Sequence, residues 1–196
     1  MNRVTKILVL AGAIMGLAAG APVIAADQKP KTAVAKENVR HEQRDTSRHE
    51  EWLGEQIRHK LVMLVDYSVF DNLAYRINGS TVELYGQVVR PSLRKGAEKE
   101  VQKIEGVERV VNRIEVLPAS FYDDRLRVQL YRSIYSDSAL SRYSMQAVPP
   151  IHIIVKNGHV TLEGVVANTS ERNLAALKAN SVPLTFSVQN NLRVEG

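Results

Sequence analysis

The second half of this 196-residue chain repeats its first half at an offset of 78 residues. Residues 82–94 (VELYGQVVRPSLR) return as residues 160–172 (VTLEGVVANTSER), and six of the thirteen positions are identical. The ends of the repeat also match without a gap, 110–116 against 188–194. A repeat of this length is a small domain used twice, because solenoid units have periods of only about 20–50 residues. Function must therefore be sought in a duplicated module.

The first 26 residues have the pattern of a secretory signal. Arg3 and Lys6 give a positive start, residues 7–17 form an apolar run, and small residues at 23–26 offer a cleavage point. The alternative is a retained membrane anchor, because residues 7–26 are long enough to span a bilayer. We expect cleavage after this segment, since it is rich in glycine and alanine and contains a proline.

The composition limits the possible partners and the compartment. The chain has no cysteine, which excludes disulfides, thiolate metal sites and a lipid attached to an N-terminal cysteine. A signal peptide without cysteine fits a soluble protein of a bacterial periplasm. The net charge of +5 falls to +3 without residues 1–26, which hold two bases and no acid. This mild excess demands no polyanion. We expect no nucleic-acid partner, because a signal peptide directs the chain away from nucleic acid and because no Gly-x-x-Gly loop occurs.

The first module is expected at residues 51–118, after a polar, charge-rich tether at 27–50. Apolar residues spaced by four, four and three at 53, 57, 61 and 64 predict a helix. Asn78-Gly79 is typical of a hairpin turn between two short strands. A second helix follows from Pro91 until Gly106, and residues 107–116 form a closing strand.

The second module, residues 119–196, repeats that order. Leu126, Leu130 and Ile134 mark its first helix, and strands flank the turn Asn157-Gly158. A helix at 170–180 and a strand at 185–194 complete it. The predicted fold class is α+β: two tandem small modules, each helix, hairpin, helix and strand. Two helices cover one face of a three-stranded mixed sheet, with a right-handed crossover.

These features resemble the BON domain. The resemblance rests on Asn78-Gly79, the Val-x-Leu-x-Gly-x-Val run at 82–88, Ser92-x-Arg94, and the Gly-Val-x-x-Val-x-Asn-x-Ile-x-Val run at 106–116. It covers nearly all of 51–196 as two copies, but the second copy has Val-Pro-Leu at 182–184 near the position of the first copy's Gly-Val. The resemblance implies a periplasmic envelope-stress protein without catalytic activity, of a family associated with phospholipid binding and osmotic protection.

Two glycines are the strongest residues of the repeated motif. Gly86 and Gly164 stand in the middle of equivalent strands. Either they leave a gap through which a ligand approaches, or they permit a bulge or close packing. We favour the second interpretation and expect both glycines to be structural.

The first helix of the second module combines charge with aromatic residues. Arg125, Arg127 and Arg132 are expected to leave its apolar face, with Tyr131 and Tyr135 beside them. This mixture suits the interface of a membrane, so these five residues are the candidate lipid-binding set. The alternative is that the tyrosines are partly buried core.

A second basic stripe lies on the second helix of the first module. Lys95, Lys99 and Lys103 recur every four residues, and they could meet anionic headgroups. Interleaved acids such as Glu98 and Glu100 favour an ordinary solvated helix face instead.

No catalytic motif is present. The sequence lacks a Gly-x-Ser-x-Gly elbow and a glycine-rich phosphate loop. His49 and His59 are ten residues apart, whereas ligands on one helix face are commonly four apart. We therefore expect no enzyme activity, cofactor or metal. The sequence favours a periplasmic protein that binds anionic phospholipid or other envelope surfaces in envelope maintenance or stress protection. A chaperone holding client polypeptides, or another partner among envelope proteins, remains the alternative, and the oligomeric state stays open.

Overall fold

A computed structural model describes residues 48–146 and 148–195 of the chain. The expected signal peptide and residues 27–47 of the expected tether lie outside these described residues. Residues 48–50, which the sequence analysis placed in the tether, are already helical. The first helix therefore occupies residues 48–62 of the described chain and starts earlier than its apolar spacing indicated.

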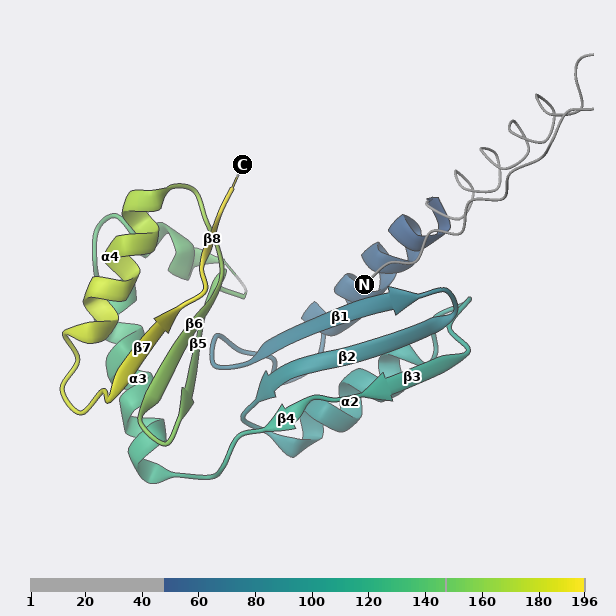
Figure 1. The fold of residues 1–196 in the computed structure, drawn as a ribbon, viewed down its shortest axis with the longest axis horizontal. Helices are drawn as coiled ribbons and strands as arrows, with labels where there is room; N and C mark the ends of the chain where they lie inside the picture. The colour runs from purple at the N-terminus through teal and green to yellow at the C-terminus, as the bar shows by residue number, and fades with distance from the viewer. Residues whose placement is uncertain (1–47, 147, 196) are drawn as a thin grey trace, which may run out of the picture. The chain divides into compact units, whose positions relative to one another are not determined.

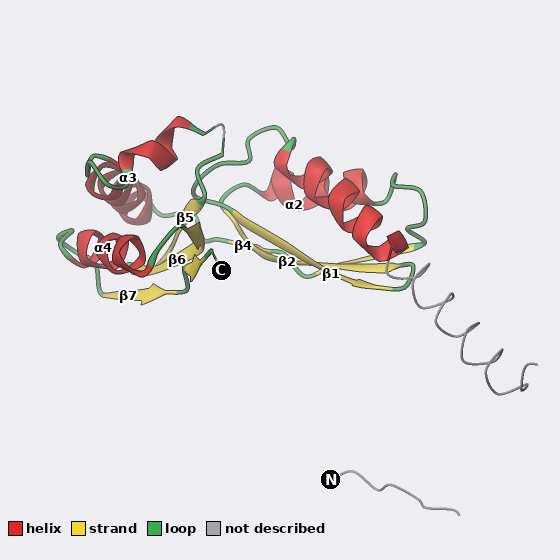
Figure 2. Ribbon diagram, turned by 90° about the horizontal axis from the view of Figure 1, so that it is seen from above, coloured by secondary structure: helices red, strands yellow, loops and turns green. Residues whose placement is uncertain are grey.

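The first module has the predicted order of elements (Figure 1). After the helix at 48–62 come β1 (Asn72–Asn78), β2 (Thr81–Val88), α2 (Pro91–Val101), β3 (Arg109–Asn112) and β4 (Glu115–Val116). β1 pairs antiparallel with β2, and β2 pairs in parallel with both β3 and β4. The sheet is therefore mixed, as predicted, and both helices lie on one of its faces (Figure 2).

The second module repeats this topology. Its elements are α3 (Phe121–Tyr135), the short 3-10 helix η1 (Ser141–Met145), β5 (Ile151–Lys156), β6 (His159–Val166), α4 (Thr169–Asn180), β7 (Ser187–Asn190) and β8 (Arg193–Val194). β5 pairs antiparallel with β6, and β6 pairs in parallel with β7 and β8. The two-module α+β fold read from the sequence is confirmed.

Alternating side chains of the central strand build each core. Val82, Leu84 and Val88 of β2 are fully buried against the helices, because successive side chains of a strand point to opposite faces. Leu53 and Ile57 of the first helix join the same cluster. The equivalent positions of β6 are buried in the second core. The predicted apolar faces are therefore those that pack.

The closing strands are broken, where the sequence predicted continuous ones. Asn112 ends β3: its Nδ2 donates to the Arg94 carbonyl of α2 at 2.9 Å, and its Oδ1 accepts from the Ile114 amide at 3.1 Å. Asn190 repeats both bonds with Arg172 and Leu192 at 2.9 and 3.2 Å. One side chain thus connects helix to strand and turns the chain between the two short strands of each module.

We expect Asn190→Ala to lower the free energy of unfolding of the second module by about 2 kcal/mol, because two hydrogen bonds worth about 1 kcal/mol each are lost. The control is Asn191→Ala, whose exposed side chain reaches only the side chains of Glu163 and Gln189 and should cost under about 0.5 kcal/mol. Urea unfolding followed by circular dichroism measures both. Equal midpoints for the two variants would contradict this role of Asn190.

Candidate functional site

Two of the five candidate lipid-binding residues are buried, which corrects the expectation that they reach the surface. Arg127 is 3 % exposed, and its Nη2 donates to the Val155 carbonyl at 2.7 Å while Nη1 pairs with Asp124. Tyr135 is 5 % exposed and donates to the Ile151 carbonyl at 2.6 Å. Burial raises the pKa of Tyr135. Both side chains therefore stabilise the contact between α3 and β5.

Tyr131 is half-buried between other rings. Its centroid lies 4.8 Å from that of Tyr135 and 6.3 Å from that of Phe70. Arg125 and Arg132 are exposed, and neither forms an ion pair with any described residue. They are seven positions apart, which is about two helical turns, so both lie on one face of α3. Only these two members of the candidate set can meet a charged surface directly.

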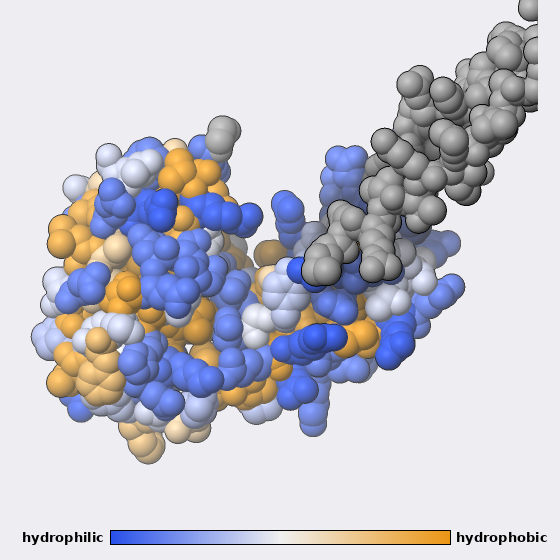
Figure 3. All heavy atoms as spheres, viewed as in Figure 1, coloured by the Kyte–Doolittle hydropathy of each residue, from blue (hydrophilic) through white to orange (hydrophobic). Residues whose placement is uncertain are grey.

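An exposed apolar surface that the sequence analysis missed lies at the beginning of α3. We call Phe121, Tyr122, Leu184 and Phe186 the aromatic patch. Their exposed fractions are 91 %, 37 %, 63 % and 67 %. Figure 3 shows apolar side chains reaching the surface at this end of the second module, where α3 begins and the loop between α4 and β7 runs. Exposed large apolar side chains that gather in one place mark an interaction surface.

Specific contacts fix the geometry of the aromatic patch. The rings of Tyr122 and Phe186 stack with centroids 6.1 Å apart, and the Tyr122 hydroxyl donates to the Leu184 carbonyl. The ring of His159 meets Phe186 edge-on at 5.9 Å. Phe186 also covers Gly158, where any Cβ would lie 2.7 Å from the ring. Tyr122, Leu184 and Phe186 are therefore exposed but held in place, whereas Phe121 is almost fully exposed.

Leu184 has an unfavourable backbone conformation. Its φ is +72°, in the left-handed region, which costs a residue with a Cβ about 1–2 kcal/mol. The repeat places it opposite Gly106 of the first module, whose φ is +87°. The second module thus carries an exposed leucine where the first has the residue suited to that conformation. Because this backbone strain is retained at an exposed leucine, Leu184 is a candidate functional residue.

The charge next to the aromatic patch is positive. Arg125 lies one turn into α3 and lines a small cavity of about 40 Å³ with Tyr122 and Leu184. The two acids of the first turn are engaged elsewhere. Asp123 accepts hydrogen bonds from the hairpin turn of β5 and β6, and Asp124 pairs with Arg127. An apolar surface with an unpaired arginine at its side suits an anionic, amphiphilic partner.

Gly86 and Gly164 have a structural reason in the geometry of the sheet. Their φ angles are +115° and +124°, and an added Cβ would lie 2.0 Å from the Asn72 carbonyl oxygen and 1.8 Å from that of Pro150. The close neighbour is the adjacent strand and not a helix or a ligand cavity. These positions therefore let the hairpin backbones approach each other.

The histidines do not form a metal site in the part of the chain that the structure describes. No group of three His, Cys, Asp or Glu side chains there could hold a metal ion. Burial lowers the pKa of His152, although nearby carbonyls and Asp71 oppose that effect, and its ring lies 5.8 Å from that of Tyr67. No helix among the described residues is both long and apolar enough to cross a membrane.

Comparison with known proteins gives one family and several solved structures with a distant likeness. The family described as "BON domain" matches residues 49–118 and 135–196. No curated protein matches the chain. Two solved structures of CdsD, a structural protein of the Type III secretion system of Chlamydia trachomatis, are similar at 10 % and 11 % identity. They cover 70 % and 71 % of this chain and 96 % and 92 % of their own, each with a TM-score of 0.26.

Proposed function

The chain belongs to the BON domain family, and from that premise we propose that it is a periplasmic protein that binds anionic phospholipid at envelope surfaces. The BON family consists of binding domains without catalytic activity that are associated with the cell envelope. The aromatic patch carries the proposal for this chain. It offers Phe121, Leu184 and Phe186 to a bilayer interface, with Arg125 positioned for headgroup phosphates.

The apolar side chains should supply most of the binding free energy. Full burial of one leucine or phenylalanine contributes about 1.5–3 kcal/mol, whereas one base near an anionic surface contributes about 1 kcal/mol. Tyrosine also suits the headgroup level of a membrane, and phenylalanine and leucine suit the inserted apolar face. We therefore assign the apolar insertion to the aromatic patch and a smaller electrostatic part to Arg125 and Arg132.

Leu184→Gly is the sharpest test, because it removes the exposed side chain and the backbone strain together. We expect the affinity for liposomes that contain phosphatidylglycerol to fall about 30-fold, since about 2 kcal/mol of burial is lost. The free energy of unfolding should stay unchanged or rise by up to about 1 kcal/mol. Co-sedimentation measures the first quantity and urea unfolding the second.

The control variant is Met145→Ser, which removes another exposed apolar side chain, 88 % exposed in η1, and should leave binding unchanged. Arg125→Ser should weaken binding about 5-fold, from loss of one base, and added salt should weaken it further. The proposal would be contradicted if liposome binding did not depend on the anionic fraction of the lipid and was unchanged in Leu184→Gly. If this chain instead suppressed the aggregation of unfolded polypeptides, the result would support the chaperone alternative.

A further inference from the structure

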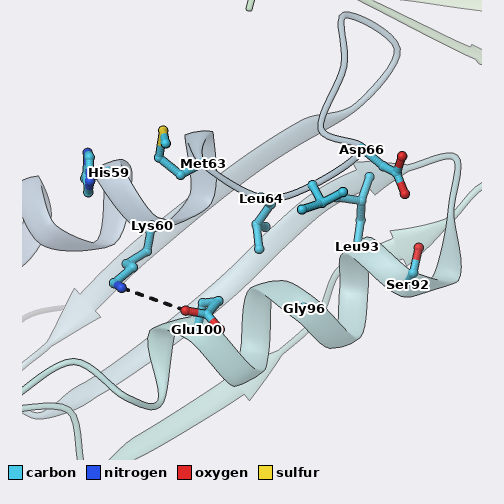
Figure 4. Close-up of a pocket in the computed structure, with 10 residues that line it drawn as sticks. His59, Lys60, Met63, Leu64, Asp66, Ser92, Leu93, Gly96 and Glu100 are labelled. Carbon is cyan, nitrogen blue, oxygen red and sulfur yellow. Dashed lines mark ion pairs between the residues drawn. The ribbon is translucent and has the colours of Figure 1, made fainter.

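A groove in the first module lies outside the surface assigned to lipid. It runs between the helix at 48–62 and α2, with a volume of about 530 Å³. Figure 4 shows Leu64 and Leu93 in its middle and Gly96 on α2 below them, with the ion pair of Lys60 and Glu100 across one end. Because Gly96 has no side chain, this part of α2 leaves room for another backbone to approach.

One wall of the groove is an apolar run left open to solvent. Residues 61–65 read Leu-Val-Met-Leu-Val. Met63, Leu64 and Val65 line the groove, and Met63 and Val65 are 69 % and 85 % exposed, whereas Leu61 is buried. Helix periodicity accounts for apolar residues at Leu61 and Leu64, which continue the core-facing stripe, but not at the other positions of the run. A run of exposed apolar residues is unfavourable in water unless a partner covers it.

The charges around the groove favour an acidic partner. Both of its acids are already paired: Asp66 with Arg90 at 2.7 Å, and Glu100 with Lys60 and Lys103. Lys95 lies three positions after Ser92, and Lys99 lies three positions after Gly96. Residues three apart are neighbours on a helix surface, so both lysines lie beside the groove on α2. Neither forms an ion pair within residues 48–146 and 148–195. The free charge along this rim is therefore positive.

From this juxtaposition we infer that the groove binds an amphipathic helix of a partner protein, with its apolar face on Met63, Leu64 and Gly96 and acidic residues meeting Lys95 and Lys99. A groove between two helices accepts a third helix through apolar anchors spaced three and four apart. Met63 adds an adaptable side chain of the kind found on peptide-binding surfaces. This binding does not depend on the aromatic patch of the other module.

The chain contains its own reporters for a test. It has four methionines, of which Met63 lies at the groove and Met145 lies in η1 of the second module. The probe is a synthetic helical peptide of about 18 residues, long enough to fold on binding, with leucines on one face and glutamates on the other. In the full chain labelled with ¹³C-methyl methionine, titration should shift the Met63 signal and leave Met145 unchanged.

Two substitutions at Gly96 distinguish a blocked groove from an unfolded module. Gly96→Leu fills the groove and raises helix propensity, so it should abolish binding without unfolding the module. Gly96→Ala is the matched control: its Cβ would meet Leu64 at an ordinary 3.5 Å, and binding should persist. The double substitution Lys95→Glu and Lys99→Glu should lower the affinity for the glutamate peptide roughly 10-fold, because two exposed ion pairs become repulsive.

Three results would overturn the inference. The first is unchanged binding by folded Gly96→Leu, and the second is equal affinity for a peptide with lysines in place of the glutamates. The third is a Met63 shift caused by monomeric lysophosphatidylglycerol but not by the peptide, which would assign the groove to a lipid. Liposome binding by wild-type chain and Leu184→Gly is measured in parallel, so failure of the membrane proposal is seen separately.

Discussion

Replacing Gly164 with alanine is expected to lower the free energy of unfolding of the second module by about 3 kcal/mol, and Gly86→Ala should do the same in the first. Two costs combine. A left-handed backbone with a Cβ costs about 1–3 kcal/mol, and overpacking costs a further 1–3 kcal/mol, roughly. The Cβ would lie 1.8 Å from the Pro150 carbonyl oxygen or 2.0 Å from that of Asn72. Relief requires separating the paired strands, so we expect a lower urea midpoint.

Gly79→Ala is the control, because it isolates the conformational cost. Gly79 also has a positive φ, +61°, but no atom lies within 4 Å of the position of its Cβ. Its cost should stay near 1 kcal/mol. If Gly164→Ala and Gly86→Ala both unfold at the wild-type midpoint, neither glycine is needed for strand packing. That result would favour the alternative, in which the glycines leave a gap for a ligand.

The fold was predictable because two independent patterns agreed. The period of the apolar residues changes from helix to strand in the same order in both copies, and the repeat at an offset of 78 confirms each assignment with a second sequence. The breaks in the closing strands were not predictable. They depend on hydrogen bonds from Asn112 and Asn190 to helix carbonyls, and residues 107–116 show no turn signal of their own.

The candidate site was only partly predictable, and α3 shows why. The apolar residues 126, 130 and 134 defined its core face, and the next stripe at 127, 131 and 135 was assigned to the candidate lipid-binding set. In the structure that stripe faces β5, where the carbonyls of Val155 and Ile151 need donors. Arg127 and Tyr135 supply them. Helix periodicity indicates one buried stripe but cannot reveal polar partners on a neighbouring strand.

The aromatic patch was missed for a different reason. Its members lie at the first turn of α3 and in the loop before β7, about 60 residues apart, so no window of sequence contains them together. One signal was available: Leu184 aligns with Gly106 in the repeat. The left-handed φ at both positions shows that the second module keeps the turn and changes the side chain. A glycine replaced within an otherwise matched repeat is worth testing as a functional position.

Asp123→Ala should be the other strongly destabilising change, by about 3 kcal/mol in the second module. Asp123 is fully buried, and its carboxylate accepts from the Asn157 amide at 2.8 Å and the Gly158 amide at 2.9 Å. Hydrogen bonds to charged groups contribute about 1.5–3 kcal/mol each. Both turn residues have positive φ, +52° and +79°, which Asn-Gly adopts readily in a hairpin turn, and the carboxylate anchors this turn to α3 through both amides. Alanine would also leave the buried Gly158 amide without its partner.

Two comparisons make the Asp123 prediction specific. Asp123→Asn retains one acceptor oxygen and should cost about half as much. Glu115→Ala removes an exposed acid of β4 that pairs with Lys156, the last residue of β5, and should cost under about 1 kcal/mol. Amide hydrogen exchange at Gly158 should accelerate in Asp123→Ala before the rest of the module is affected. If Asp123→Ala unfolds at the midpoint of Glu115→Ala and Gly158 stays protected, the carboxylate does not stabilise the turn, and the hairpin register must be maintained by the β5–β6 ladder alone.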